Sequence, residues 1–279
     1  MKIENHKMIS EEGDFEVGFR ETPNRSGYFK DGLPDTIVLH YTGGSSLDSS
    51  IGWLTNENAK ASAHFVVGKD GRIVQLAPVN TITWHAGRSK WKNRDSLNNY
   101  SIGIEIDNAG LLEKRANGYA TCFNKRIDEG QVVLAKHKNN DKEEAWEAYT
   151  TQQIEAVESL CSALIQKYPI KEIVGHDDIA PGRKVDPGPA FPLVKLRDKI
   201  LLGRKDDDER VEGESESQDP GYGSVTVNLL NIRSLPNGNA PTVSAPLPLG
   251  TKVKILDKQG KWYKVSLQTE GWVNARFVK

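Results

Sequence analysis

Apolar positions in the first part of the chain follow the period of strands and of helices in turn. The run at 36–40 is apolar and rich in β-branched residues, which predicts a buried strand. Two further runs, at 63–67 and 72–76, flank a Lys-Asp-Gly turn and predict a hairpin. These segments are candidates for strands of a common core.

Another strand and a long helix follow. In 101–107, isoleucines alternate with Gly103 and Glu105, so the isoleucines share one face of the predicted strand while Gly103 and Glu105 share the other. Thr150 and Gln153 fit a capping box, with the threonine at the N-cap and the glutamine at N3. Apolar residues then recur at helical spacing. The alternation predicts a mixed α/β domain with a sheet in the middle.

Residues 110–149 break this alternation. The segment is polar and charged and has no clear period, so it looks like a long insertion between a strand and the capped helix. Loops of this length in compact domains are usually functional or disordered. We therefore expect a lid or a rim near the substrate.

Two shifts in composition divide the chain into a first domain at 1–202, a linker at 203–223 and a last domain at 224–279. The linker holds three Lys/Arg against eight Asp/Glu, which predicts an acidic, flexible segment. The last domain holds eight Lys/Arg against two Asp/Glu, a net charge of +6. Its short apolar runs between Pro, Gly and Asn turns predict a small all-β barrel. The strand candidates are 225–229, 252–256, 262–266 and 271–273.

The overall composition is that of an ordinary globular protein, with 37% hydrophobic and 27% charged residues. The net charge of −1 does not indicate a nucleic-acid partner. No stretch approaches the roughly 20 apolar residues of a membrane span. Cys122 and Cys161 form no C-x-x-C pair, so no disulfide scaffold is expected, and Cys161 falls on the apolar stripe of the helix.

Five polar residues stand where predicted strands end or where a stiff loop follows. His40 closes the first strand, Glu105 lies on the isoleucine-rich strand, and His176 follows an apolar run. Lys184 and Asp186 come later in the same loop, among prolines and glycines. Two histidines and one aspartate make a three-ligand zinc site with an open fourth position, which is the pattern of a catalytic zinc.

The chemistry of such a site gives the other two residues a role. A zinc ion lowers the pKa of a water in its open position towards about 7. Glu105 is suited to take a proton from this water and pass it to a leaving amine, and Lys184 is suited to stabilise an oxyanion. A single histidine at a strand end is more often structural, and spacing alone does not prove that these residues meet.

A resemblance to a known family supports the proposed grouping of these five residues. The segments that carry it are IVLHYT at 37–42, AHFVVGKDG at 63–71, WHAG at 84–87, NYSIGIE at 99–105 and HDDIAPGRKVDPGPAF at 176–191. From about residue 33 to 200, interrupted by 110–149, the chain resembles AmpD-like, type 2 N-acetylmuramoyl-L-alanine amidases. The resemblance implies a mixed central sheet flanked by helices, the fold shared with peptidoglycan recognition proteins.

The same resemblance implies a role for each of the five polar residues. His40, His176 and Asp186 would be the ligands of one Zn²⁺ ion per chain. Glu105 would be the general base and acid, and Lys184 would stabilise the oxyanion.

Tyr41, Trp84, His85 and Arg183 are candidates for substrate contact. His85 lies in a segment that lines the cleft in the family, and structural packing is an equal alternative. Arg183 is suited to a bidentate hydrogen bond with a peptide carboxylate, or it is a solvated loop charge. The sequence does not decide between these two interpretations of Arg183.

Other aromatic and polar residues are interpreted as structural. His64 lies in the middle of a predicted strand, where a histidine is often satisfied by hydrogen bonds. Trp53 and Trp146 are expected in the core. Asp177 and Asp178 are expected to shape the loop after His176.

The last domain resembles the bacterial SH3-like (SH3b) wall-binding module. A barrel with a charge of +6 is attracted to an anionic polymer such as the cell wall. Trp272 is expected in the barrel core, whereas Trp262 and Tyr263 either fill the core or stack on a ligand. The segments that carry this resemblance lie at 227–236, 249–255, 262–265 and 271–273.

These resemblances imply an enzyme that hydrolyses the amide between the MurNAc lactyl group and L-alanine in peptidoglycan or muropeptides. The alternative is a non-catalytic protein that recognises muropeptides on the same fold, and the presence of all five polar residues favours the enzyme. The family includes recycling enzymes that act on anhydro-muropeptides, envelope amidases that degrade intact wall, and phage endolysins. The SH3b module favours polymeric wall.

The N-terminal segment bears on the cellular location of the chain. The N-terminus has no apolar h-region, which predicts a chain without a cleaved signal peptide that is cytoplasmic as synthesised. Release to the cell wall by lysis, or by a route that the N-terminus does not encode, stays open. A monomer is expected.

Overall fold

The computed structural model describes residues 1–202 without a break and parts of the remaining chain. The chain divides into two compact units, residues 1–210 and 211–279. The acidic linker and the domain limits expected from composition stay predictions, because 203–221 lie outside the described residues. The described parts beyond 202 are 222–224, 229–236, 242–243, 247–248, 251–259 and 262–266.

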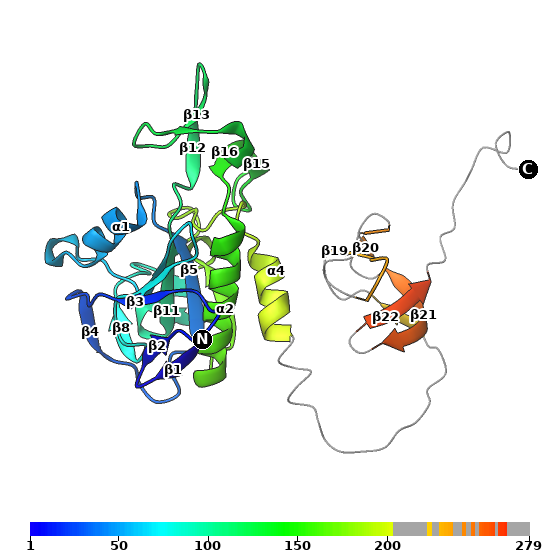
Figure 1. Cartoon of the computed structure of the whole chain (residues 1–279), viewed down its shortest axis with the longest axis horizontal. Helices are drawn as coiled ribbons and strands as arrows, with labels where there is room; N and C mark the ends of the chain where they lie inside the picture. Colours follow the sequence, from blue (N-terminus) through cyan, green and yellow to red (C-terminus); the bar gives the residue numbers. More distant parts are fainter. Residues whose placement is uncertain are drawn as a thin grey trace, which may run out of the picture. The chain divides into compact units, whose positions relative to one another are not determined.

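A six-stranded mixed sheet forms the centre of the first unit (Figure 1). The first four strands in its spatial order are parallel, the fifth runs antiparallel to the fourth, and the sixth is parallel to the fifth. The predicted strands at 36–40 and 101–107 and the hairpin at 63–76 are confirmed. The spatial order is β17 (Glu172–Gly175), β5 (Thr36–Tyr41), β11 (Ser101–Ile106), β6 (Phe65–Val67), β7 (Ile73–Gln75) and β3 (Val17–Phe19).

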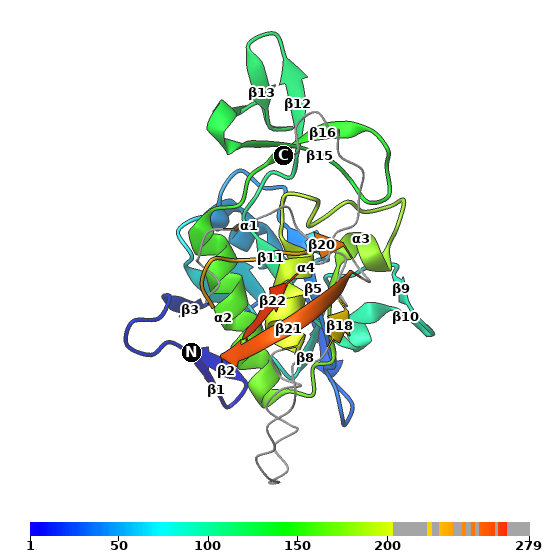
Figure 2. The ribbon, with the colours of Figure 1, turned by 90° about the vertical axis from the view of Figure 1, so that its right-hand side faces the viewer.

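Helix α2 (Thr151–Lys167) covers one face of this sheet (Figures 1 and 2). It begins with the predicted capping box, in which Thr150 Oγ1 accepts from the Gln153 amide and Gln153 Oε1 accepts from the Thr150 amide. Its apolar stripe packs against the isoleucines of β11 in the largest core cluster, which removes both surfaces from water. Cys161 is fully buried in that cluster as predicted, and both cysteines are free.

Helix α1 (Leu47–Leu54) packs in a second apolar cluster with the other face of β6 and β7. Its buried residues include Ile51, which belongs to the same cluster as Val66 and Val74. Helices therefore flank a mixed sheet, as the resemblance implies. None of the helices in the described residues has the length and apolar character to cross a membrane. The other helices of this unit are α3 (His176–Ile179), α4 (Leu193–Arg197) and the π-helical turn η4 (Asp198–Leu202).

Short elements complete the first unit. Strands β1 and β2 form a hairpin, β4 pairs with β8, and β9 pairs with β10. Their bounds are β1 (Lys2–Glu4), β2 (Lys7–Ile9), β4 (Arg25–Tyr28), β8 (Thr81–Thr83), β9 (Lys90–Trp91) and β10 (Arg94–Asp95), with the 3-10 turns η1 (Glu57–Ala59) and η2 (Leu97–Asn99).

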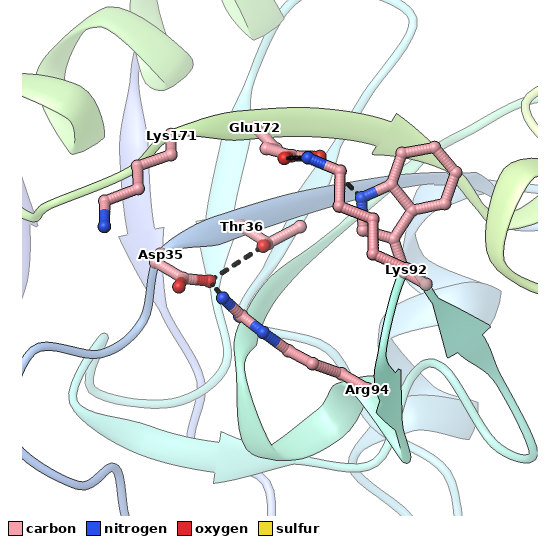
Figure 3. Close-up of a pocket in the computed structure, with 7 residues that line it drawn as sticks. Asp35, Thr36, Lys92, Arg94, Lys171 and Glu172 are labelled. Atoms are coloured by element: carbon pink, nitrogen blue, oxygen red, sulfur yellow. Dashed lines mark hydrogen bonds and ion pairs between the residues drawn. The ribbon is translucent and has the colours of Figure 1, made fainter.

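Ion pairs tie the β9–β10 hairpin to the amino-terminal ends of β5 and β17 (Figure 3). Arg94 donates to Asp35 at 2.7 Å, and Lys92 pairs with Glu172. The pairs line a small cavity of about 50 Å³. Ligands of open α/β sheets bind at the carboxyl ends of strands, and both carboxylates here are already paired. We therefore interpret these ion pairs as structural contacts and the cavity between them as no ligand site.

Residues 110–149 form a five-stranded antiparallel sheet of their own, and not the loop that their lack of period suggests. Its strands are short and lack alternation of buried and exposed residues: in β12 only Leu112 is buried, and in β16 the three consecutive residues 145–147 are buried. A small core of Ala109, Leu112, Ile127 and Ala145 holds the sheet together. The order is β14 (Arg126–Ile127), β13 (Gly118–Ala120), β12 (Leu111–Arg115), β16 (Glu143–Glu147) and β15 (Val132–Lys136), with η3 (Glu129–Gln131) before β15.

The described part of the second unit consists of strands, which confirms the expected all-β character. The predicted strands at 252–256 and 262–266 are confirmed, whereas most of 225–229 and all of 271–273, with Trp272, lie outside the described residues. Trp262 is half-buried and Tyr263 is exposed. The antiparallel pairings join β18 (Tyr222–Ser224), β21 (Lys252–Gln259) and β22 (Trp262–Ser266), and separately β19 (Leu229–Leu230) and β20 (Leu247–Pro248).

Candidate functional site

His40 and Glu105 project from the same face of the central sheet, and His176 follows the strand beside β5. His40 on β5 and Glu105 on β11 are register partners in neighbouring parallel strands, so their side chains point to the same side. Val174 on β17 pairs with Val38 on β5, and His176 is the first residue of α3, two residues after Val174. All three residues line one cavity at the carboxyl ends of these strands.

A return loop brings the other two residues to this sheet end. The loop leaves α3, and its Lys184 amide donates to the Ala180 carbonyl at 3.0 Å. Farther along, the Asp186 carbonyl accepts from the Asp177 amide at 2.9 Å, which holds the loop against the residue after His176. Asp186 therefore lies beside the two histidines, as predicted.

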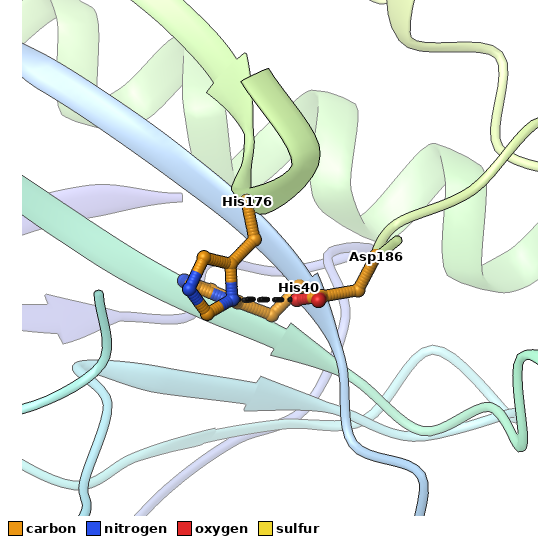
Figure 4. Close-up of side chains that lie close together, drawn as sticks. All are labelled: His40, His176 and Asp186. Atoms are coloured by element: carbon orange, nitrogen blue, oxygen red, sulfur yellow. Dashed lines mark hydrogen bonds and ion pairs between the residues drawn. The ribbon is translucent and has the colours of Figure 1, made fainter. Parts of the chain in front are cut away.

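The side chains of His40, His176 and Asp186 converge on one point (Figure 4). His40 Nδ1 and His176 Nδ1 are 2.9 Å apart, and Asp186 Oδ2 lies 3.0 Å from the first and 2.9 Å from the second. A tetrahedral zinc ion with ligands at about 2.0–2.1 Å would separate the ligand atoms by about 3.3 Å. The three atoms fit such an ion after movements of a few tenths of an ångström.

The outer nitrogens of both histidines are held by the segment Trp84-His85-Ala86. His85 Nε2 lies 3.2 Å from the Ser101 carbonyl, which only accepts, so this nitrogen carries the proton. His85 Nδ1 then accepts from His40 Nε2 at 3.0 Å. His176 Nε2 donates to the Ala86 carbonyl at 3.1 Å. Each ligand histidine therefore turns an unprotonated Nδ1 towards the common point, which is the tautomer that binds a metal.

The electrostatics of His40 and Asp186 agree with this state. Burial, together with the neighbouring His176, lowers the pKa of His40 to about 4, so the ring is neutral near pH 7. Burial opposes the ionisation of Asp186, but the closeness of His176 and His40 outweighs it and lowers the pKa of the carboxyl. Two imidazole nitrogens and one carboxylate oxygen form a donor set that suits Zn²⁺.

Glu105 and Lys184 face the same cavity, which has a volume of about 560 Å³. Burial, reinforced by the charge of Asp186, raises the pKa of Glu105 well above its usual value, and Lys184 offsets only part of this. Within the described residues, the Glu105 carboxylate makes no hydrogen bond of its own. A carboxylate that is half-buried, without a hydrogen bond and open to a cavity is suited to exchange protons with a bound reactant.

The four predicted substrate contacts also line this cavity. Trp84 donates from Nε1 to Ser26, and Arg183 donates to the carbonyls of Ala86 and Arg88 at 3.1 and 2.6 Å. Both ring nitrogens of His85 are already engaged. Contact with substrate stays a prediction for all four, and Arg183 and His85 have in addition a structural role.

Tyr41 borders the cavity at the start of the inserted sheet. Burial, with the charge of Asp186, raises the pKa of Tyr41 to about 12, so its hydroxyl keeps its proton. Its ring lies against Gly110, where a Cβ would come within 2.2 Å of Tyr41 Cζ. Gly110 also has a φ of +72°. Both the lack of space beside Tyr41 and the backbone conformation therefore require a glycine at this position.

Two tryptophan assignments have opposite outcomes. Trp146 is 1% exposed, as expected for a core residue. The placement of Trp53 in the core is wrong, because its side chain is 60% exposed and lines the cavity from α1. Helical spacing did not show that Trp53 is exposed, because Trp53 is adjacent in the sequence to Leu54, whose side chain is buried.

His64 lies behind the site and is held entirely by the protein. Its Nε2 donates to the Thr81 carbonyl at 2.7 Å, and its Nδ1 accepts from the Gly103 amide at 3.0 Å. These bonds support the structural interpretation of this residue. Gly103 also makes room for His85, because a Cβ there would lie 2.3 Å from His85 Cγ. A glycine within a strand was the only sequence signal for this packing.

We expect His85→Ala to weaken metal binding by about 10- to 100-fold, because loss of an outer hydrogen-bond partner releases the orientation of a ligand histidine. Competition with a chelator of known affinity measures the effect. His6→Ala is the control, since His6 bonds to Tyr168 and lies outside the cavity lining. An unchanged metal affinity of the folded His85 variant would show that other contacts orient His40.

Comparisons with known proteins agree with this geometry. A family model described as N-acetylmuramoyl-L-alanine amidase matches residues 30–189, which is more than half of the chain. A second model, described as bacterial SH3 domain, matches residues 228–279. Both families are those that the sequence resembles.

Two curated relatives from Escherichia coli (strain K12) illustrate the similarity. N-acetylmuramoyl-L-alanine amidase AmiD is 32% identical over 206 residues, which cover 70% of this chain and 63% of that protein. The 1,6-anhydro-N-acetylmuramyl-L-alanine amidase AmpD is 34% identical over 148 residues, which cover 52% of this chain and 61% of that protein. The chain thus spans about three fifths of the length of these relatives.

Among solved structures, the crystal structure of a selenomethionine derivative of AmpD aligns with a TM-score of 0.49 and 25% sequence identity. The alignment covers 72% of this chain and 99% of that one. The family match decides the classification, because it covers more than half of the chain. The matched range includes His40, Glu105, His176, Lys184 and Asp186. The chain belongs to the N-acetylmuramoyl-L-alanine amidase family and carries a bacterial SH3 domain after the amidase domain.

Proposed function

We propose that the chain is a zinc-dependent amidase that hydrolyses the amide between the MurNAc lactyl group and L-alanine in peptidoglycan or muropeptides. The observation that carries this proposal is the convergence of the three potential ligands with a half-buried glutamate and a lysine in one cavity. Membership of the family supports it. So do the names of the relatives AmiD and AmpD, which are amidases of this kind of bond.

Zn²⁺, one ion per chain, would be held by His40 Nδ1, His176 Nδ1 and Asp186 Oδ2. Three ligands leave one position open, which distinguishes a catalytic from a structural zinc site. When bound, the ion supplies Lewis-acid polarisation of a carbonyl and lowers the pKa of water. The protein orients both histidines through His85 and Ala86, and burial keeps His40 neutral.

Glu105 and Lys184 would act on the reacting groups. Glu105 takes a proton from the attacking water and gives it to the amine nitrogen as the amide bond breaks. The same side chain thus accepts the proton and donates it again. Burial of Glu105 makes its protonated form accessible, which the second half of this exchange needs. The Lys184 ammonium stabilises the oxyanion that forms on the former carbonyl.

Aromatic side chains would bind the substrate at the cavity wall. Trp53 and Trp84 both line the cavity and come from separate elements. An exposed indole at a cavity wall offers a flat apolar surface for a sugar ring or a peptide. With Tyr41, His85 and Arg183, these residues form the proposed substrate-binding set.

Trp53→Ala is expected to raise KM by about three- to tenfold, because loss of an aromatic contact costs about 0.5–1.5 kcal/mol. Thermal unfolding is expected to change little, since the side chain is 60% exposed. Tyr28→Ala is the matched control: Tyr28 is 74% exposed and does not line the cavity. Steady-state kinetics measure the effect, and equal KM values for the two variants would remove Trp53 from the binding set.

The second unit would bind the cell wall. The charge of +6 on residues 224–279 supports attraction to an anionic polymer, and two modules on one chain raise the local concentration of enzyme at the wall. We infer that polymeric peptidoglycan is the preferred substrate. Turnover of purified peptidoglycan and of soluble anhydro-muropeptide, measured side by side on the full chain, tests this preference. A higher kcat/KM for the soluble substrate would favour a recycling role.

The cleaved bond can be identified directly. The full chain with zinc is incubated with purified peptidoglycan, and newly formed amino groups are labelled and identified by mass spectrometry. We expect labelled L-alanine at the start of released stem peptides. Labelling of any other residue would contradict the assigned bond, and binding without any new amino group would favour a recognition protein. A monomer and synthesis in the cytoplasm stay predictions.

A further inference from the structure

The inserted sheet contacts the segment that follows the ligand His176. His137, between β15 and β16, is 4% exposed and donates from Nε2 to Asp177 Oδ2 at 2.9 Å. Its Nδ1 accepts from the Asn139 amide at 3.2 Å, which fixes the proton on Nε2. Its ring stacks on Trp146 at a centroid distance of 5.8 Å. The imidazole is therefore held in one orientation, with its donor directed at Asp177.

The next two residues strengthen the same contact. Lys138 Nζ donates to Asp177 Oδ1 at 2.8 Å and to Asp178 Oδ1 at 2.5 Å. Asn139 Nδ2 donates to the Asp177 carbonyl at 3.3 Å. Asp177 is 4% exposed, so its carboxylate depends on these donors, because a buried charge without partners is strongly destabilising.

Asp177 connects this contact to both metal-ligating segments. It directly follows His176, and its amide donates to the Asp186 carbonyl at 2.9 Å. Its carboxylate folds over Gly175, where a Cβ would lie 2.2 Å from Asp177 Oδ1. A displacement of Asp177 would therefore move His176 and Asp186 together.

A second contact from the insertion reaches the residues after Asp186. Tyr149 donates from its hydroxyl to the Pro187 carbonyl at 2.8 Å. The ring of Trp146 lies against Gly188, where a Cβ would approach it to 2.9 Å. The insertion thus also holds the loop of Lys184 and Asp186 through the residues that follow Asp186.

We propose that five residues of the insertion, here termed the brace, position the metal-ligating segments and thereby set the metal affinity of the site. They are His137, Lys138, Asn139, Trp146 and Tyr149. This proposal rests on the proposed function, because it takes His40, His176 and Asp186 as the ligands. The brace replaces the expected lid, since no residue of 110–149 lines the cavity. His137 and Lys138 are positioning residues that act through Asp177 and touch neither metal nor substrate.

His137→Ala tests the brace, with His137→Gln as the conservative variant, because a glutamine amide can still donate to Asp177. Lys142→Ala is the matched control: Lys142 lies in the same insertion, and its side chain is 75% exposed. Chelator competition gives the zinc dissociation constant of each full-length protein. The visible absorption spectrum of the cobalt-substituted protein reports the geometry of the ligands, and circular dichroism reports folding.

We expect His137→Ala to bind zinc about 10- to 100-fold more weakly, with an altered cobalt spectrum. We expect His137→Gln to recover most of the affinity, and Lys142→Ala to match the wild type. A folded His137→Ala protein with wild-type affinity and spectrum would overturn the proposal. If His137→Ala does not fold, Lys138→Met carries the same test with the same criteria, since the Lys138 side chain is 42% exposed.

Failure of the brace and failure of the proposed function are distinguishable. A wild-type chain that binds no zinc, or that binds zinc and cleaves no amide, contradicts the proposed function. A wild-type chain that does both, together with a His137→Ala variant of unchanged zinc affinity, contradicts only the brace.

Discussion

Glu105→Gln is expected to lower kcat by about 10²- to 10⁴-fold while zinc stays bound, because a positioned general base and acid contributes a factor of this size. The amide keeps the shape of the carboxyl group but cannot take a proton. Glu105 is no metal ligand, and its carboxylate makes no hydrogen bond within the described residues, so the substitution leaves the three ligands in place. Turnover of peptidoglycan and metal content, measured on the same sample, give the two readouts.

Glu155→Gln is the control for this substitution, since Glu155 is exposed on α2 and lies outside the cavity lining. It is expected to keep wild-type turnover. A Glu105→Gln protein with wild-type turnover would show that another group carries the proton. A protein that loses its zinc as well would make the loss of turnover uninformative about acid–base catalysis and would contradict the expected separation of the two roles.

Asp186→Ala is expected to lower the zinc content well below one ion per chain and the turnover by at least about 10³-fold, because the metal contributes several kcal/mol to the reaction. Two histidines alone leave the ion with too few ligands. The variant also removes the carboxylate oxygen that lies 3.0 and 2.9 Å from the Nδ1 atoms of His40 and His176. Metal analysis after dialysis and the same peptidoglycan assay measure both effects.

Asp141→Ala is the matched control, since Asp141 is exposed in the inserted sheet and belongs to no candidate metal group in the described residues. It is expected to keep both zinc and turnover. An Asp186→Ala protein that retains one zinc ion and wild-type turnover would mean that Asp186 is not a ligand and that the metal lies elsewhere.

The core of the site could be predicted because it follows from strand periodicity. His40 and Glu105 lie near the carboxyl ends of two apolar strands, and parallel pairing in register brings such residues side by side. His176 follows a third apolar strand in the same way. Lys184 and Asp186 are candidates from their place in a stiff loop, but only the family resemblance indicates that they lie beside the histidines, since no local pattern says where a loop returns.

Other features of the site have no local signal in the sequence. Trp53 lies at a helical position next to buried residues, and only the course of α1 beside the cavity shows that it is exposed. The orienting bond from His40 to His85 joins segments 45 residues apart. The strands of the inserted sheet cannot be recognised in the sequence, because buried and exposed residues do not alternate along β12 or β16 and the core of the sheet is small. In each case tertiary contacts decide the outcome, and local propensity does not.

One measurement tests the central claim most directly. The full chain is stripped of metal with a chelator, and one portion is restored with a single equivalent of zinc. Purified peptidoglycan is then digested by the stripped and the restored protein in parallel, and the soluble products are identified by mass spectrometry. The account predicts stem peptides with a free amino-terminal L-alanine from the restored protein and none from the stripped one. Equal release by both proteins, or no release by either, would contradict it.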